Sequence, residues 1–131
     1  LVLKDGLPVL AVSVAGGDLQ DQTTLNVLLN HIDFGMLPDE AVTAPRFNTN
    51  HHQDSFNPNP DRNAAFVGKG QLKVNEEIPE TVRKNLSDRD HLLGIAPSPI
   101  AHPVMIFIDH KSGLMHAAGD PKARRHAAAV K

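Results

Sequence analysis

The chain has 131 residues, of which 40% are hydrophobic, and this length and composition fit one globular domain with a core of its own. Its formal net charge of −2 gives no support for a nucleic acid or an anionic membrane as a partner. The sequence contains no cysteine, which excludes disulfides and thiol catalysis but does not assign a compartment.

The chain opens with a predicted β-hairpin. Residues 1–3 and the apolar run 9–14 flank an Asp5-Gly6 step, which is typical of a tight turn between two strands. Because the chain begins at Leu1 in what reads as a strand, we expect its N-terminus to be a cut inside a larger polypeptide.

The valine-rich run 9–14 leads through Ala15 into the pair Gly16-Gly17 and then Asp18. A half-exposed strand would alternate apolar and polar residues, so the run predicts a strand buried on both faces. The two glycines allow a sharp turn, and Asp18 is placed to cap a following helix. Backbone N–H groups at such a junction can bind an anion or a developing oxyanion, although the same short pattern is also typical of a turn that binds nothing.

Two helices are predicted next. Leucines and other apolar residues recur at three- and four-residue steps from Asp18 onward, so a helix is expected to run to about Gly35. Acidic residues at 39 and 40 then mark the first turn of a short helix, which must end before Pro45.

The segment 48–63 follows, with five asparagines, two prolines, His51-His52 and no periodicity. It predicts a long surface loop and is a candidate for covering a site.

The second half of the chain predicts strands at 71–75, 91–95, 103–109 and 114–118 and a helix at 78–86. The last two strands form a hairpin, Gly119-Asp120-Pro121 ends it, and the basic, alanine-rich tail 122–131 forms a final helical turn or two. Strands and helices in mixed order with at least two hairpins indicate an α+β fold with antiparallel pairing, and we describe residues 1–131 as a single domain.

The eight histidines do not predict a metal site, because no HExxH or facial-triad spacing is present. His110 and His116 could face each other across the last hairpin, yet a catalytic zinc ion needs a third protein ligand. Ser13 lacks the Gly-x-Ser-x-Gly context of a hydrolase nucleophile and is expected to be a small residue packed within its strand.

Two further polar residues are candidates with structural roles. Arg46, between Pro45 and Phe47, follows a short helix, and we expect it to tie neighbouring elements together through hydrogen bonds rather than to bind substrate. Asp120, between Gly119 and Pro121, is expected to be a turn or capping carboxylate, with a catalytic role as the alternative.

Several of these segments, in order, resemble one family: the C-terminal part of the small subunit of the γ-glutamyltransferases (γ-glutamyltranspeptidases). The resemblance is specific over residues 1–48, returns from residue 72 to the end, and is poor in the asparagine-rich loop. The segments that carry it are Gly6-Leu7-Pro8, Val14-Ala15-Gly16-Gly17, Asn30-His31-Ile32-Asp33-Phe34-Gly35-Met36, Glu40-Ala41-Val42, Ala44-Pro45-Arg46-Phe47 and Gly119-Asp120-Pro121.

The resemblance implies an αββα sandwich of the N-terminal-nucleophile hydrolase type, a self-cleaving precursor, and a threonine at the new N-terminus that attacks γ-glutamyl amides such as glutathione. The acyl group then passes to water or to an amino acid or peptide. In this family a Gly-Gly pair supplies the backbone oxyanion hole, and Gly16 and Gly17 stand at the position of that pair in this sequence. We expect no cofactor or metal. The sequence does not assign a compartment; relatives in this family are often periplasmic, secreted or membrane-tethered, so the resemblance implies a periplasmic or secreted location.

The nucleophilic threonine, the residues that bind the substrate's α-amino and α-carboxylate groups, and a serine pair before Leu1 would all lie upstream. The chain alone is therefore expected to be inactive, and its partners to be the upstream segment and the large subunit of the same precursor. An exposed apolar sheet face would make the fragment prone to self-association. The chain departs from the family at Ala15, where proline is usual, and at Lys122, where arginine is usual. The alternative is a non-catalytic relative that uses the same scaffold for binding or assembly.

Overall fold

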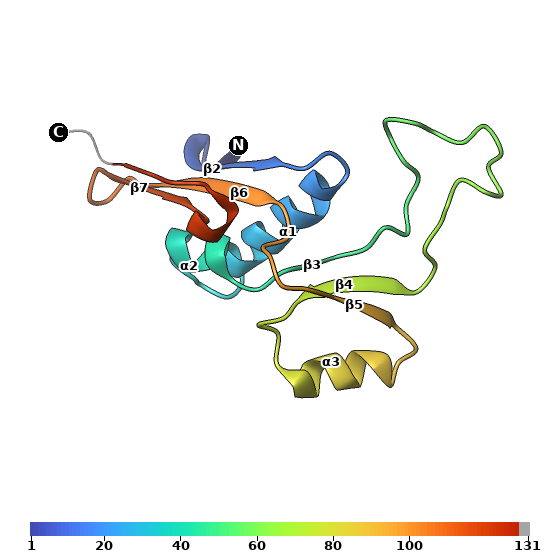
Figure 1. Cartoon of the computed structure of the whole chain (residues 1–131). Coiled ribbons are helices and arrows are strands. Elements are labelled where there is room, and N and C mark those ends of the chain that lie inside the picture. The colour runs from blue at the N-terminus through green and yellow to red at the C-terminus, as the bar shows by residue number, and fades with distance from the viewer. Residues whose placement is uncertain (129–131) are drawn as a thin grey trace. The chain divides into compact units, whose positions relative to one another are not determined.

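The computed structural model describes residues 1–128, which form two compact units (Figure 1). The first unit combines Leu1–Ala44 with the chain from Ala101 onward, and the second unit is Pro45–Ile100. The part of the predicted C-terminal helical turn that falls at residues 129–131 lies outside the described residues. The description of residues 1–131 as one domain stays a prediction.

The first unit is built on an antiparallel sheet of four strands in the order β1-β2-β6-β7. These strands are β1 (Val2–Lys4), β2 (Leu7–Ala15), β6 (His102–Asp109) and β7 (Leu114–Gly119). Asp5 and Gly6 form the turn between β1 and β2 with φ angles of 53° and 78°. Both predicted hairpins, and the antiparallel α+β fold class, are confirmed.

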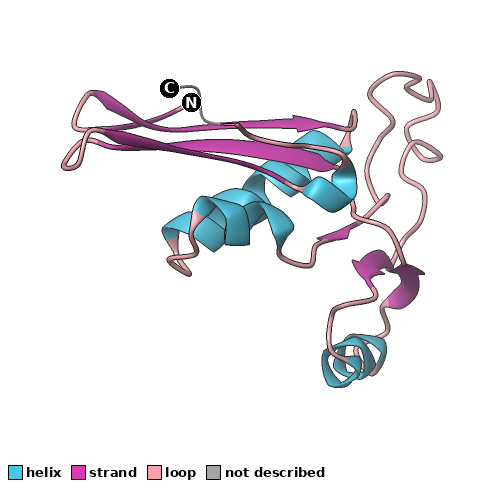
Figure 2. Ribbon diagram, turned by 60° about the vertical axis from the view of Figure 1, so that its left-hand side comes forward, coloured by secondary structure: helices cyan, strands magenta, loops and turns pink. Residues whose placement is uncertain are grey.

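Two helices cover one face of this sheet, as Figure 2 shows. They are α1 (Leu19–Ile32) and α2 (Pro38–Thr43), close to the predicted bounds. Asp39 and Glu40 lie in the first turn of α2 as expected, and the main-chain N–H of Leu37 donates to Glu40 Oε2 at 2.8 Å. The core between helices and sheet consists of Leu10, Val27, Ala41, Val42, Met105 and Ala118.

Among the described residues of the first unit, no helix covers the opposite face of this sheet, and most side chains on that face are apolar. The strand register places Ala11 beside Ile106 and Ile108 beside Met115 on this face, which we call the open sheet face. Ile106 and Met115 are 42% and 73% exposed. The predicted burial of β2 on both faces is therefore wrong for the described residues: its buried side chains lie toward the helices.

The predicted capping role of Asp18 is also wrong in its detail. Asp18 occupies the N-cap position of α1, but its side chain makes no capping hydrogen bond there. The helix begins instead with main-chain bonds, because Leu19 N donates to Gly16 O at 3.1 Å and Gln20 N donates to Gly17 O at 2.9 Å. The glycine turn itself therefore starts the helix.

The second unit holds a three-stranded sheet in the order β3-β4-β5 and one helix. Its elements are β3 (Phe47–Asn48), β4 (Gln71–Asn75), α3 (Glu80–Ser87) and β5 (Leu92–Ala96). β4 and β5 pair in parallel, contrary to the antiparallel pairing expected, because α3 provides the crossover that a parallel pair needs. Residues 49–70 contain no helix or strand, which confirms the long loop.

No helix within residues 1–128 is both long enough and apolar enough to span a membrane. The helices of both units instead lie beside sheets.

The buried hydroxyl of Thr23 leads to a prediction about stability. Thr23 lies on α1 with 0% exposure, and its Oγ1 has no hydrogen-bond partner among the described residues. Thr23→Val keeps the shape of the side chain and removes an unpaired buried polar atom, so we expect the free energy of unfolding to rise by about 1–2 kcal/mol. Urea denaturation measures this change. Thr24→Val, at the adjacent and less buried position, is the control, and an unchanged or lower stability for Thr23→Val would contradict the prediction.

Candidate active site

The turn between β2 and α1 presents two glycines in conformations that other residues rarely adopt. Gly16 has φ +150° and Gly17 has φ +58°. Their carbonyl groups accept the first hydrogen bonds of α1, whereas their N–H groups donate to no turn or cap hydrogen bond within residues 1–128. These two N–H groups lie at the positive end of the α1 dipole, an arrangement suited to a negatively charged oxygen.

The surroundings of Gly16 leave space for a Cβ atom, but the φ angle of Gly16 favours glycine. A Cβ atom added at Gly16 would lie 3.4 Å from the Cβ of Leu19 and 3.7 Å from the Cβ of Ala101, which are ordinary packing distances. The requirement for glycine at this position therefore comes from φ and not from lack of space.

Arg46 is buried in the second unit, with 1% of its surface exposed. Its Nε donates to the carbonyl of Ile100 at 2.8 Å, and its main-chain N–H donates to Asn75 Oδ1 at 2.7 Å. The side-chain amide of Asn75 also donates to Ser98 O at 2.9 Å. These bonds join three separate segments of the second unit, and the role of Arg46 as a tether stays a prediction.

Asp120 is buried in the first unit, with 2% of its surface exposed, and lies at the start of the short helix η1 (Pro121–Ala123). Its Oδ1 accepts hydrogen bonds from the main-chain N–H groups of Lys122 at 3.0 Å and Ala123 at 3.3 Å. This geometry is that of a helix N-cap. The Asp120 carboxylate therefore accepts hydrogen bonds from main-chain donors of η1.

The histidines are dispersed rather than gathered into a site. The β6–β7 register places His116 opposite Phe107, and the His110 ring bonds to Pro8 O at 2.8 Å, so the predicted facing of His110 and His116 is wrong. Within residues 1–128 no group of three or more His, Cys, Asp or Glu side chains is placed to hold a metal ion. Ser13 is exposed on β2 and is not packed as expected.

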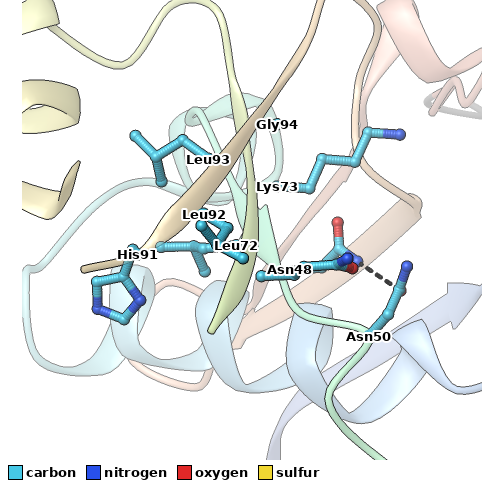
Figure 3. A pocket seen from close by; sticks show the side chains of 9 residues that line it. Asn48, Asn50, Leu72, Lys73, His91, Leu92, Leu93 and Gly94 are labelled. Atoms are coloured by element: carbon cyan, nitrogen blue, oxygen red, sulfur yellow. Dashed lines mark hydrogen bonds between the residues drawn. The ribbon is translucent and has the colours of Figure 1, made fainter. Parts of the chain in front are cut away.

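An open cavity of about 580 Å³ lies over the sheet of the second unit (Figure 3). Asn48, Lys73 and His91 are among its lining residues, and Asn48 Nδ2 donates to Asn50 Oδ1 at 3.4 Å. Figure 3 shows the Lys73 and His91 side chains pointing in opposite directions. The cavity therefore does not bring these two groups together on one ligand.

The sequence singles out the glycine pair, whose oxyanion role stays a prediction, but it does not single out Asn75 or His102. Asn75 bridges two segments, and His102 Nδ1 bonds to Ala123 O at 3.0 Å. Neither has a local sequence signal, because each contact joins residues more than twenty positions apart.

Comparison with known proteins gives a consistent picture. The model of the family described as gamma-glutamyltranspeptidase matches residues 1–130. A glutathione hydrolase proenzyme of Bacillus subtilis (strain 168) is 28% identical over 99% of this chain, which covers 19% of that protein, and one of Bacillus subtilis subsp. natto is 27% identical over 86% of the chain and 16% of that protein. The chain thus spans less than a fifth of these relatives.

Solved structures agree in fold. A gamma-glutamyltranspeptidase mutant of Helicobacter pylori is 26% identical with a TM-score of 0.69, covering 92% of this chain and 57% of that chain. The gamma-glutamyltranspeptidase of Pseudomonas nitroreducens is 23% identical with a TM-score of 0.76, covering 99% and 60%. A cephalosporin acylase of Bacillus halodurans, 23% identical with a TM-score of 0.73, covers 91% and 19% and shares the N-terminal-nucleophile type of fold.

Proposed function

The chain belongs to the gamma-glutamyltranspeptidase family, and from this membership we propose that it is the C-terminal part of the small subunit of an enzyme that hydrolyses or transfers γ-glutamyl groups. The nucleophile is a threonine upstream of this chain, released by self-cleavage, and the substrate is a γ-glutamyl amide of the glutathione type. The match over residues 1–130 supports this proposal, as does the small share of the proenzymes that the chain covers.

The glycine turn gives this chain its part in the reaction. Attack of the threonine oxygen on the γ-carbonyl carbon places a negative charge on the carbonyl oxygen, and the N–H groups of Gly16 and Gly17 donate to that oxygen. The amine then leaves with a proton, and water or an acceptor amine takes the acyl group. The observation that carries the proposal is the pair of positive-φ glycines whose N–H groups donate to no turn or cap hydrogen bond within residues 1–128.

The chain by itself is expected to hydrolyse γ-glutamyl-p-nitroanilide no faster than the uncatalysed background, because an oxyanion hole without a nucleophile forms no tetrahedral intermediate. The longer polypeptide, with its upstream threonine, is expected to release p-nitroaniline, and threonine to alanine at that position should abolish the release. Turnover by the chain alone would refute the proposal. A longer polypeptide without such a threonine would favour a non-catalytic relative.

We propose that the rest of the same polypeptide covers the open sheet face. The chain alone should therefore self-associate at high concentration in sedimentation velocity, because exposed apolar sheet surface pairs readily with a second copy. Met115→Lys, on this face and 73% exposed, should shift the chain toward monomer. Leu114→Lys is the control, because residue 114 alternates to the other face. A chain that is strictly monomeric at every concentration would contradict this expectation.

A further inference from the structure

His102 is the cross-strand neighbour of the entrance to the glycine turn. It is the first residue of β6, and the register pairs it with Ala15, the residue directly before Gly16. Paired Cα atoms in an antiparallel ladder lie about 4.5–5.5 Å apart. The backbone at His102 therefore lies directly beside the backbone that enters the turn.

Ala101, the residue before His102, lies next to the turn. Ala101 is buried with φ +58°, a conformation that residues with a side chain rarely adopt, and its Cβ faces the position of a Gly16 Cβ at 3.7 Å. Such a conformation persists only where the surrounding structure imposes it. Something must therefore hold the start of β6 in place.

The His102 ring makes a hydrogen bond at this point of the chain. Its Nδ1 lies 3.0 Å from the carbonyl oxygen of Ala123. A carbonyl oxygen only accepts, so Nδ1 carries the hydrogen and donates it. The bond joins the start of β6 to η1, twenty-one residues further along the chain.

The structure at the other end of this bond is itself well fixed. Asp120 caps η1, and Arg125 N donates to Asp120 O at 2.9 Å. A Cβ added at Gly119 would lie 2.8 Å from the main-chain carbon of Arg125, so the chain folds back closely over β7. Ala123 is thus a firm anchor for the His102 ring.

We propose that His102 is a positioning residue for the Gly16-Gly17 turn: its bond to Ala123 holds Ala101 and the start of β6 against the turn and so fixes the direction of the two glycine N–H groups. This proposal rests on the oxyanion-hole function proposed above. We expect the position of the turn to affect the reaction rate, because a displacement of about 1 Å at a catalytic group can cost about a hundredfold in rate.

Steady-state kinetics of the longer polypeptide test the proposal. His102→Ala is expected to lower kcat by about tenfold with KM changed by less than about twofold, because the turn acts on the transition state. His102→Asn places an amide N–H near the position of Nδ1, so it should restore most of the lost kcat. If His102→Asn is as slow as His102→Ala, or if both keep the original kcat, the proposal is wrong.

His110→Ala is the matched control. It removes the same kind of bond, a 2.8 Å contact between an imidazole nitrogen and Pro8 O, just beyond the opposite end of β6. That position lies about 26 Å from His102 along the strand. We expect His110→Ala to keep the original kcat, and an equal loss of kcat in both alanine variants would overturn the proposal.

A second readout does not depend on activity. In ¹H–¹⁵N NMR spectra of the 131-residue chain, His102→Ala should shift the amide resonances of Gly16 and Gly17 further than His102→Asn does, because both variants lose the imidazole ring but only alanine loses the hydrogen bond. His110→Ala should leave these resonances in place. An inactive longer polypeptide would refute the proposed function, while these spectra would still test the positioning role. Unshifted glycine resonances in His102→Ala would overturn it.

Discussion

Alanine in place of Gly16 is expected to lower kcat of the longer polypeptide on γ-glutamyl-p-nitroanilide by about 10²- to 10³-fold, the size of the loss when one oxyanion-hole donor is removed. Gly16 has φ +150°, and alanine avoids that conformation, so the backbone must rotate and turn its N–H away. Neighbouring atoms do not forbid the methyl group, because Leu19 and Ala101 lie at ordinary contact distances from it. The loss should therefore appear in kcat, with KM little changed.

Gly113→Ala is the matched control for Gly16→Ala. Gly113 has φ +74° in the β6–β7 turn, and a Cβ added there meets nothing within 4 Å. Alanine carries a conformational cost at both positive-φ positions, so both variants should lose stability. Only Gly16→Ala should lose kcat. A Gly16→Ala enzyme that is less stable but turns over at the original rate would rule out Gly16 as an oxyanion donor.

The parts of the fold that follow local rules could be predicted from the sequence. The spacing of apolar residues predicts α1, the Asp5-Gly6 step predicts the β1–β2 turn, and a single glycine pair marks where β2 gives way to α1. Each of these depends on residues close together in the chain. The glycine turn of the candidate site belongs to this class.

The parts that the sequence did not predict depend on distant residues. β3 has two residues, too few for any periodicity, and the parallel pairing of β4 with β5 depends on where α3 returns the chain. The apolar run of β2 predicts burial on both faces, yet the described residues cover only one. Apolar content indicates that a face needs cover, and it does not say whether the same chain supplies that cover.

The contacts around the site also escaped local rules. His102 reaches Ala123 across twenty-one residues, and Asn75 reaches Arg46 across twenty-nine. The predicted capping role of Asp18 is wrong for a local reason. The carbonyl groups of Gly16 and Gly17 already accept the first hydrogen bonds of α1, and the Asp18 side chain makes no capping bond there.

Arg46→Ala is expected to lower the free energy of unfolding of the chain by about 2–4 kcal/mol, since it empties a large buried volume and leaves a buried carbonyl without its charged donor. Arg46 is 1% exposed, and its Nε is bonded to Ile100 O at 2.8 Å. Arg46→Lys should recover part of the loss, because lysine keeps the charge but lacks the planar guanidinium. Urea denaturation measures all three proteins.

Arg89→Ala separates burial from hydrogen bonding as the source of this effect. Arg89 lies in the same unit, and its Nε also donates one hydrogen bond, to Asn85 Oδ1 at 3.0 Å, but its side chain is exposed. Its removal should change stability by less than about 0.5 kcal/mol. If Arg46 tethers the second unit, the longer polypeptide with Arg46→Ala should keep its KM at temperatures where it remains folded. A KM raised about tenfold with unchanged stability would instead make Arg46 a substrate-binding residue.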